Sequence, residues 1–208
     1  MSELLRARVW GVIELDKLEF VGKINMTVNK EKIIIRPEKL FEYEEVKKLI
    51  YKAFAEQHGI ETGKFMMEHF IEERKKDTFI PELSLVAVLE NGTIVGEVAL
   101  HQTDIVTENG NITQLVLAQS AVLPEYRMQG IMRRLVEYAL KEAEKMGYGA
   151  VFLGGNPNLY GRFGFEPSSA YGIYHENRKK WGDEGFMVCI LKAGVLNGVT
   201  GTTYYYGG

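Results

Sequence analysis

Residues 115–132 read LVLAQSAVLPEYRMQGIM and join an apolar run to the start of a helix. The run Leu115–Leu123 predicts a buried strand, and the turn Arg127–Met132 leads into an amphipathic pattern. The first N–H groups of a helix lack internal acceptors and carry a partial positive charge, so this turn is aimed where phosphate groups bind. An ordinary strand-to-helix loop is the alternative, but three cations surround the turn: Arg127, Arg133 and Arg134.

A second strand follows the helix and completes a crossover. The apolar stripe of the helix consists of Ile131, Leu135, Ala139, Leu140, Ala143 and Met146, and it stops at Gly147. The apolar segment Ala150–Leu153 then predicts a strand. Strand–helix–strand connections are right-handed in about 98% of cases and place their two strands parallel. The stretch therefore predicts one parallel pair of strands.

The segments before the crossover predict antiparallel strands. Asn91-Gly92 is a hairpin turn between the apolar segments Leu83–Leu89 and Thr93–Leu100, and Asn109-Gly110 marks the next turn. Further elements are a strand at Ile33–Ile35, helices at 37–57 and 64–75, a short helix at 159–163 and a strand at 186–191. A mostly antiparallel sheet with helices on both faces follows, which is an α+β fold.

Composition bounds the class of protein. A chain of 208 residues with 46% hydrophobic content supports one domain with a sizeable core. Its 28 acidic and 25 basic residues give a net charge of −3, which provides no general attraction for nucleic acid or for an anionic membrane. The single cysteine, Cys189, forms no internal disulfide and suits a reducing cytoplasm. Charges near the start interrupt any signal peptide, and no apolar run is long enough to span a bilayer.

Two motifs together resemble the GNAT family of acetyl-CoA-dependent N-acetyltransferases. The first is Leu123–Arg127 leading into Gly130, and the second is Asn156–Phe165. The ending Gly194–Thr202 is similar to a bacterial subgroup of predicted acetyltransferases, and the likeness covers roughly residues 32–202. It implies a GNAT acyl-CoA N-acyltransferase fold whose parallel strands splay to admit coenzyme A. Residues 31–208 are then the acetyltransferase domain, and residues 1–30 are an extension that forms strands or an arm pairing with a second subunit in a homodimer.

The resemblance implies a set of coenzyme-binding residues. The turn holds the pyrophosphate through Arg127, Met128, Gln129, Gly130, Ile131 and Met132, with Arg133 beside it. Met132 departs from the small residue that is usual there, which puts the coenzyme affinity in question. Ala121, Val122 and Leu123 line the gap for pantetheine, and a backbone N–H near Val122 or Leu123 holds the acetyl oxyanion. Phe163 and Asn156 complete the set, although Asn156 before Pro157 is also a typical turn residue.

Three residues are candidates for catalysis. By resemblance, Tyr160 protonates the departing thiolate, and the alternative is a tyrosine packed with Phe163 and Phe165. Glu97 and His101 are candidates for the general base, because residues four apart on one strand share a face. Core packing is the alternative for both.

The sequence thus predicts transfer of acetyl from acetyl-CoA, a co-substrate, to a primary amine by direct attack and without a metal. The acceptor is a small molecule or a peptide of unidentified structure. A non-catalytic module that senses acyl-CoA is the alternative function. His58 and His69 lie in the helical region that often shapes the acceptor site of the family, and the tail Tyr204–Tyr206 lines a pocket, joins a partner or packs on an edge strand.

Overall fold

The computed structural model describes residues 32–205. The predictions for residues 1–30 and for Tyr206 lie outside the described residues. Within residues 32–205, no helix combines the length and the apolarity needed to cross a membrane.

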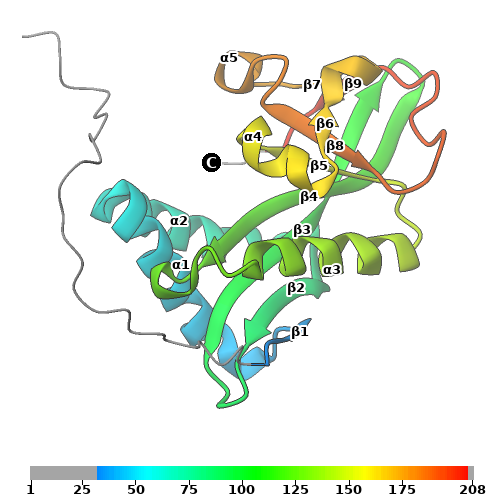
Figure 1. Ribbon diagram of the computed structural model, residues 1–208. Coiled ribbons are helices and arrows are strands. Elements are labelled where there is room, and N and C mark those ends of the chain that lie inside the picture. Colours follow the sequence, from blue (N-terminus) through cyan, green and yellow to red (C-terminus); the bar gives the residue numbers. More distant parts are fainter. Residues whose placement is uncertain (1–31, 206–208) are drawn as a thin grey trace, which may run out of the picture. The chain divides into compact units, whose positions relative to one another are not determined.

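The strands form a mixed sheet in the order β1-β2-β3-β4-β5-β8-β6, with β9 paired to β3 and β7 paired to β9 (Figure 1). The predicted hairpin and the predicted parallel pair, β4 with β5, are both present. A second, short parallel pair, β7 with β9, was not predicted. The strand bounds are β1 Ile34–Pro37, β2 Phe79–Val88, β3 Ile94–Thr107, β4 Gly110–Val122, β5 Ala150–Gly154, β6 Glu166–Pro167, β7 Ile173–His175, β8 Phe186–Ile190 and β9 Gly201–Thr203.

The helices are α1 Tyr43–His58, α2 Ile60–Glu73, α3 Ile131–Lys145, α4 Pro157–Tyr160 and α5 Arg178–Trp181. The first four overlap the expected ranges, α2 begins four residues before the expected residue 64, and α5 was not predicted. The first helix starts later than the predicted residue 37, because Pro37 ends β1 and the segment Leu40–Glu42 forms a single 3-10 turn. Gly59, with a φ of 95°, separates α1 from α2.

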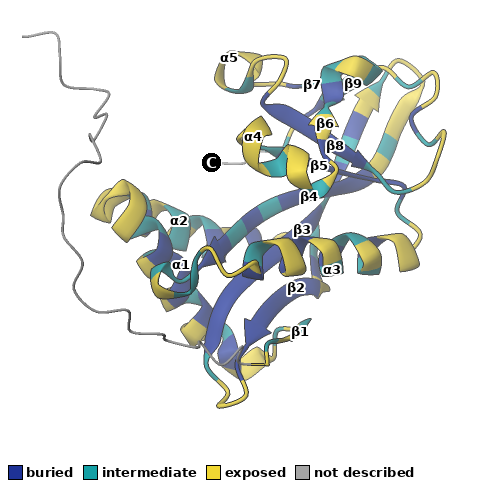
Figure 2. Cartoon of the chain, viewed as in Figure 1, coloured by how far each residue is buried: buried dark blue, intermediate teal, exposed yellow. Residues whose placement is uncertain are grey.

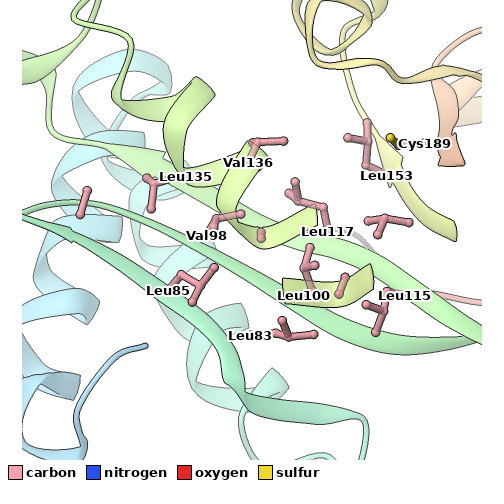
Figure 3. Packing of buried hydrophobic residues seen from close by; sticks show 14 of the residues in the cluster. Leu83, Leu85, Val98, Leu100, Leu115, Leu117, Leu135, Val136, Leu153 and Cys189 are labelled. Atoms are coloured by element: carbon pink, nitrogen blue, oxygen red, sulfur yellow. The ribbon is translucent and has the colours of Figure 1, made fainter. Parts of the chain in front are cut away.

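The helices cover opposite faces of the sheet. Leu85 and Val86 are consecutive on β2, so their side chains point to opposite faces. Leu85 packs in the cluster that contains Leu135 and Val136 of α3 (Figure 3), whereas Val86 packs in the cluster formed by α1 and α2. The central strands are consequently buried on both faces, and the outer helix surfaces are exposed (Figure 2).

The strands β4 and β5 separate after two paired positions. Leu115 pairs with Val151 and Val116 with Phe152, but β4 continues alone to Val122. On its other edge, β4 stays paired to β3, where a bulge places Ala118 as an extra residue. A bulge bends its strand and increases the local twist. The result is a gap between β4 and β5 in which the last residues of β4 have no strand partner on this edge within residues 32–205.

Candidate active site

A cavity of about 770 Å³ lies at this gap. Its lining comes from the turn before α3, the free end of β4, the segment 159–163, the end of β5, α1, α2, and residues near the C-terminus. Among the predicted site residues, the cavity is lined by Ala121, Val122, Arg127, Met128, Gly130, Ile131, Met132, Arg133, Tyr160 and Phe163. Leu123, Gln129, Asn156, Glu97 and His101 are not lining residues.

The turn before α3 presents free backbone N–H groups. Gly130 is the N-cap of α3 in a left-handed conformation with a φ of 77°, and no side chain caps the helix. Met128 also has a positive φ, 62°, and its side chain is fully exposed. Alternation of right- and left-handed residues turns successive N–H groups to one side, which makes a concave site for an anion. A Cβ on Gly130 would meet nothing within 4 Å, so open space faces this backbone.

The three predicted cations of the turn have different roles. The Arg127 guanidinium donates to the carbonyls of Val122 and Ala53 at 3.2 and 2.8 Å, and thereby ties α1 to the end of β4. Arg134 donates to the carbonyl of Ile33 at 2.7 Å and does not line the cavity. Arg133 also lines the cavity, and it donates no hydrogen bond to a backbone carbonyl of the described residues. Its guanidinium lies 5.8 Å from the centroid of the Phe163 ring. The three arginines therefore differ in their partners, and of the three Arg127 and Arg133 line the cavity.

The free edge of β4 exposes alternate backbone groups. The Leu123 N–H donates to the Val95 carbonyl at 2.9 Å, so it is not available as an oxyanion donor. Hydrogen-bonded and non-hydrogen-bonded pairs alternate in an antiparallel ladder. Ser120 and Val122, which lie between the bonded positions, therefore turn their N–H and carbonyl groups to the open edge. The bond from Arg127 to the Val122 carbonyl agrees with this orientation.

Tyr160 lies at the gap and packs there as well. Its ring rests on the backbone of Gly155, where a Cβ would come within 2.5 Å of the ring, so glycine is needed at this position. Phe163 and Phe165 contact the ring edge to face. The hydroxyl lies 3.2 Å from the Ser120 hydroxyl, and burial raises the pKa of Tyr160. The packed position of Tyr160 is therefore confirmed, and this packing presents the phenol to the cavity.

Asn156 and Gln129 have local roles. Asn156 is the N-cap of α4, and its side chain accepts a hydrogen bond from the Asn158 N–H at 2.9 Å. This is the turn role that was the alternative for Asn156. The Gln129 amide donates to the Glu125 carbonyl at 3.4 Å.

Glu97 is a buried carboxyl beside the open part of β4. It pairs across the ladder with Ala121, which lines the cavity, and shares its face of the sheet. The residue is 1% exposed, and neither carboxyl oxygen has a hydrogen-bond partner among the described residues. Burial raises the pKa of Glu97 to about 8, Arg74 opposes this shift, and Glu38 adds to it. Glu97 is therefore protonated at neutral pH.

His101 lies on the same face but farther from the gap. It pairs with Val116, where β4 and β5 are still joined. Its Nδ1 lies 3.6 Å from a Glu73 carboxyl oxygen, and its ring contacts Phe79. Burial is the main cause that lowers the pKa of His101 to about 4, so the ring is neutral. The two predicted bases thus share a face, and only Glu97 lies at the level where β4 has separated from β5.

Replacing Glu97 with Gln is expected to remove a pH-dependent loss of stability. An acid whose pKa rises from 4.5 to about 8 on folding binds more protons when folded, so stability falls as the pH rises between these values. The loss amounts to at most about 5 kcal/mol above pH ~8. Denaturant unfolding of both proteins from pH 4 to 9 measures it: the advantage of Glu97→Gln should grow with pH. Parallel curves for the two proteins would contradict the burial of an uncompensated carboxyl.

Several lining residues were not predicted as site residues. Ser120, Arg162, His175, Trp181 and Tyr205 all line the cavity. Only Tyr205 had a signal in the sequence, as part of the aromatic tail for which a pocket was one interpretation. Ser120 and Arg162 are sequence neighbours of the predicted Ala121 and Phe163, whereas His175 and Trp181 come from segments that the fold brings to the cavity from farther along the chain.

Comparisons with known proteins agree with the geometry. The family model described as "Acetyltransferase (GNAT) domain" matches residues 34–168. The N-acetyltransferase YhbS of Escherichia coli K12 is 36% identical over 138 residues, which are 65% of this chain and 78% of YhbS. YjhQ from the same strain, also named an N-acetyltransferase, is 32% identical over 108 residues, 49% of this chain and 59% of YjhQ.

Solved structures show the same fold. The crystal structure of YhbS from Escherichia coli in complex with CoA has a TM-score of 0.70 at 29% identity and covers 85% of this chain and 91% of that one. A GNAT acetyltransferase from Brucella melitensis in complex with acetyl-CoA has a TM-score of 0.66 at 21% identity, with 85% and 98% covered, which bears on the fold alone. With the sheet, the splayed strands and the turn at Gly130 in place, the chain belongs to the GNAT family of acetyltransferases, whose members use acetyl-CoA as co-substrate.

Proposed function

We propose that residues 31–208 form an enzyme domain that transfers acetyl from acetyl-CoA to a primary amine by direct attack. One observation carries this proposal. A single cavity connects the N-terminus of α3 with the opposite face of the sheet through the gap between β4 and β5. A thioester held in the gap would face the coenzyme on one side and an amine on the other.

The coenzyme fits the residues that line one end of the cavity. The pyrophosphate would accept from N–H groups of the turn 128–132, where Gly130 leaves open space. Arg133 and Arg162 line this end and supply positive charge. Pantetheine would lie along the open edge of β4 and pair with its backbone as an additional strand would. YhbS, a structural relative whose crystal structure is a complex with CoA, supports binding of this coenzyme by the fold.

The chemistry requires an oxyanion donor, a general acid and a general base from the protein. The amine lone pair forms the C–N bond, and the thioester carbonyl becomes an oxyanion for which the Val122 N–H is the proposed donor. When the intermediate collapses, the C–S bond breaks and its electron pair stays on sulfur. The Tyr160 hydroxyl donates its proton to this thiolate. Ser120, at 3.2 Å from the phenol, holds the hydroxyl in position.

We assign Glu97, rather than His101, as the group that takes the proton from the amine. Glu97 lies on β3 opposite Ala121, at the level where β4 has separated from β5, and its two oxygens are unpartnered within the described part of the chain. Its pKa of about 8 means that the accepting form appears only as the pH rises through that value. An inflection near pH 8 in the rate of the wild-type protein, absent in Glu97→Gln, would support the assignment.

Amine-dependent release of coenzyme A tests the function. We expect acetyl-CoA to raise the melting temperature, and a thiol reagent to detect free coenzyme A at a rate that increases with amine concentration. Stabilisation by the coenzyme without thiol release across a broad panel of amines would instead favour an acyl-CoA sensor. If acetyl-CoA neither raised the melting temperature nor released thiol in the presence of amines, both the transferase and the sensor functions would be overturned.

A further inference from the structure

The cavity opens on both faces of the sheet. Ser120 contacts Tyr160 on the face covered by α3, whereas the Gln119 amide donates to the Met66 carbonyl of α2 at 3.3 Å. Ala121 packs in the cluster formed by α1 and α2. All three β4 residues line the cavity. With the coenzyme placed at the turn before α3 as proposed above, the opposite end of the cavity, on the α1–α2 face, is left for the acceptor amine.

This acceptor end is apolar and aromatic. Phe54 and Met66 contribute from α1 and α2, and they pack against the same cluster as Ala121. Trp181, Phe186 and Tyr205 contribute from the other side, where they pack in the cluster that contains Val116. Gln57, an exposed residue of α1, adds a neutral polar group.

Among the described residues that line the cavity, there are positively charged side chains but no carboxylates. No aspartate or glutamate is found among the lining residues in the described ranges. Of its arginines, Arg133 lies beside the turn and over the Phe163 ring, and Arg162 is next to Phe163 in sequence, whereas the Arg127 guanidinium is bonded to the carbonyls of Ala53 and Val122. A cation held in an apolar site without a carboxylate is costly unless it is neutralised. The reacting amine loses its charge in the reaction, but a second ammonium on the acceptor would keep it.

Two aromatic rings are fixed at this end. Gly154, the last residue of β5, has no Cβ, and one placed there would come within 2.5 Å of the Trp181 ring, so this ring lies against the β5 backbone at the gap. The Tyr205 carbonyl accepts a hydrogen bond from His175 Nε2, because His175 Nδ1 accepts from the Asn177 N–H at 2.9 Å. The Tyr205 ring also contacts the His101 ring. Rigid aromatic rings provide a flat apolar surface, and a ring face can stabilise one ammonium group through a cation–π interaction.

We propose that the acceptor is a primary monoamine with an apolar body of aromatic size, and that Trp181 and Tyr205 select it. This inference rests on the proposed function. The amine would reach the thioester through the gap while its body stays between these rings and the apolar side chains of α1 and α2. Polyamines and polycationic antibiotics would be poor acceptors because their additional ammonium groups find no carboxylate in the lining.

A panel of amines tests the class of acceptor. We expect the full-length protein with acetyl-CoA to acetylate 2-phenylethylamine and tryptamine with a kcat/KM at least about tenfold above that for spermidine. Thiol release and mass spectrometry of the product measure this. A kcat/KM for spermidine equal to or above that for the aromatic monoamines would overturn the proposal and leave the acetyltransferase function intact.

Two variants are expected to change the preference between aromatic monoamines and spermidine. Trp181→Ala should raise the KM for 2-phenylethylamine about tenfold or more and leave the KM for acetyl-CoA unchanged. Phe41→Ala removes an aromatic side chain that is 80% exposed and lines no part of the cavity, and it serves as the matched control. Gln57→Glu, at an exposed position, should shift the preference toward spermidine. If neither Trp181→Ala nor Gln57→Glu alters the preference, the assignment of this end is refuted.

Binding of the amine separates the inference from the function. Titration of 2-phenylethylamine into the protein loaded with coenzyme A, followed by calorimetry, should show saturable binding that Trp181→Ala weakens. Such binding without thiol release would uphold the acceptor class and refute catalysis. If aromatic monoamines did not bind but another amine were acetylated, the acetyltransferase function would be upheld and the proposed acceptor class refuted.

Discussion

Tyr160→Phe is expected to lower the kcat of acetyl transfer by about 10²- to 10⁴-fold, the usual contribution of a positioned general acid. The variant keeps the ring that rests on Gly155 and contacts Phe163 and Phe165, so the fold and the coenzyme-binding turn should be unchanged. Only the hydroxyl near Ser120 is lost. Steady-state kinetics together with calorimetric titration of coenzyme A measure the two properties separately.

Tyr126→Phe is the matched control for this prediction. Tyr126 also lines the cavity and packs against the same hydrophobic cluster as Tyr160, but it precedes the turn, and the hydroxyl that pairs with Ser120 is that of Tyr160. It should retain the wild-type kcat. Turnover by Tyr160→Phe equal to that of Tyr126→Phe would refute the assignment of the acid, and a matching loss of coenzyme affinity would show that Tyr160 acts in binding instead.

The fold was predictable because its signals are local. The hairpin turn at Asn91-Gly92 and the apolar stripe from Ile131 to Met146 depend on residues close in sequence. Both gave elements of the correct type and connection. The start of α1 was misplaced, because Pro37 is compatible with both a strand end and a helix start.

The side-chain partners were less predictable because they depend on distant segments. The composition of the turn placed Arg127 beside a phosphate, but the fold brings the Ala53 carbonyl, 74 residues away, within 2.8 Å of its guanidinium. A backbone carbonyl leaves no signal in the sequence. The same holds for Trp181, whose position depends on the absence of a side chain at Gly154. Patterns in one chain therefore reveal the turn and its backbone, while the acceptor end becomes visible only in three dimensions.

Gly130→Ala should weaken coenzyme A binding roughly tenfold to a hundredfold. The φ of 77° at this position is unfavourable for a residue with a Cβ, and relaxation of the turn would re-aim the N–H groups that face the pyrophosphate. Loss of one hydrogen bond to a charged group, worth about 1.5 to 3 kcal/mol, gives an effect of this size. In addition, the new methyl group would occupy the open space that now faces the backbone.

Gly147→Ala provides a control with the same conformational cost. Gly147 has a φ of 92°, lies just beyond the other end of α3, and would likewise place a Cβ in open space. Both variants should lose about 1 to 2 kcal/mol of unfolding free energy, because both force a side chain into a left-handed conformation. Only Gly130→Ala should lose affinity for coenzyme A in calorimetric titration. Equal affinities in the two variants would mean that the turn before α3 does not hold the pyrophosphate, and the assignment of this end of the cavity to the coenzyme would fail with it.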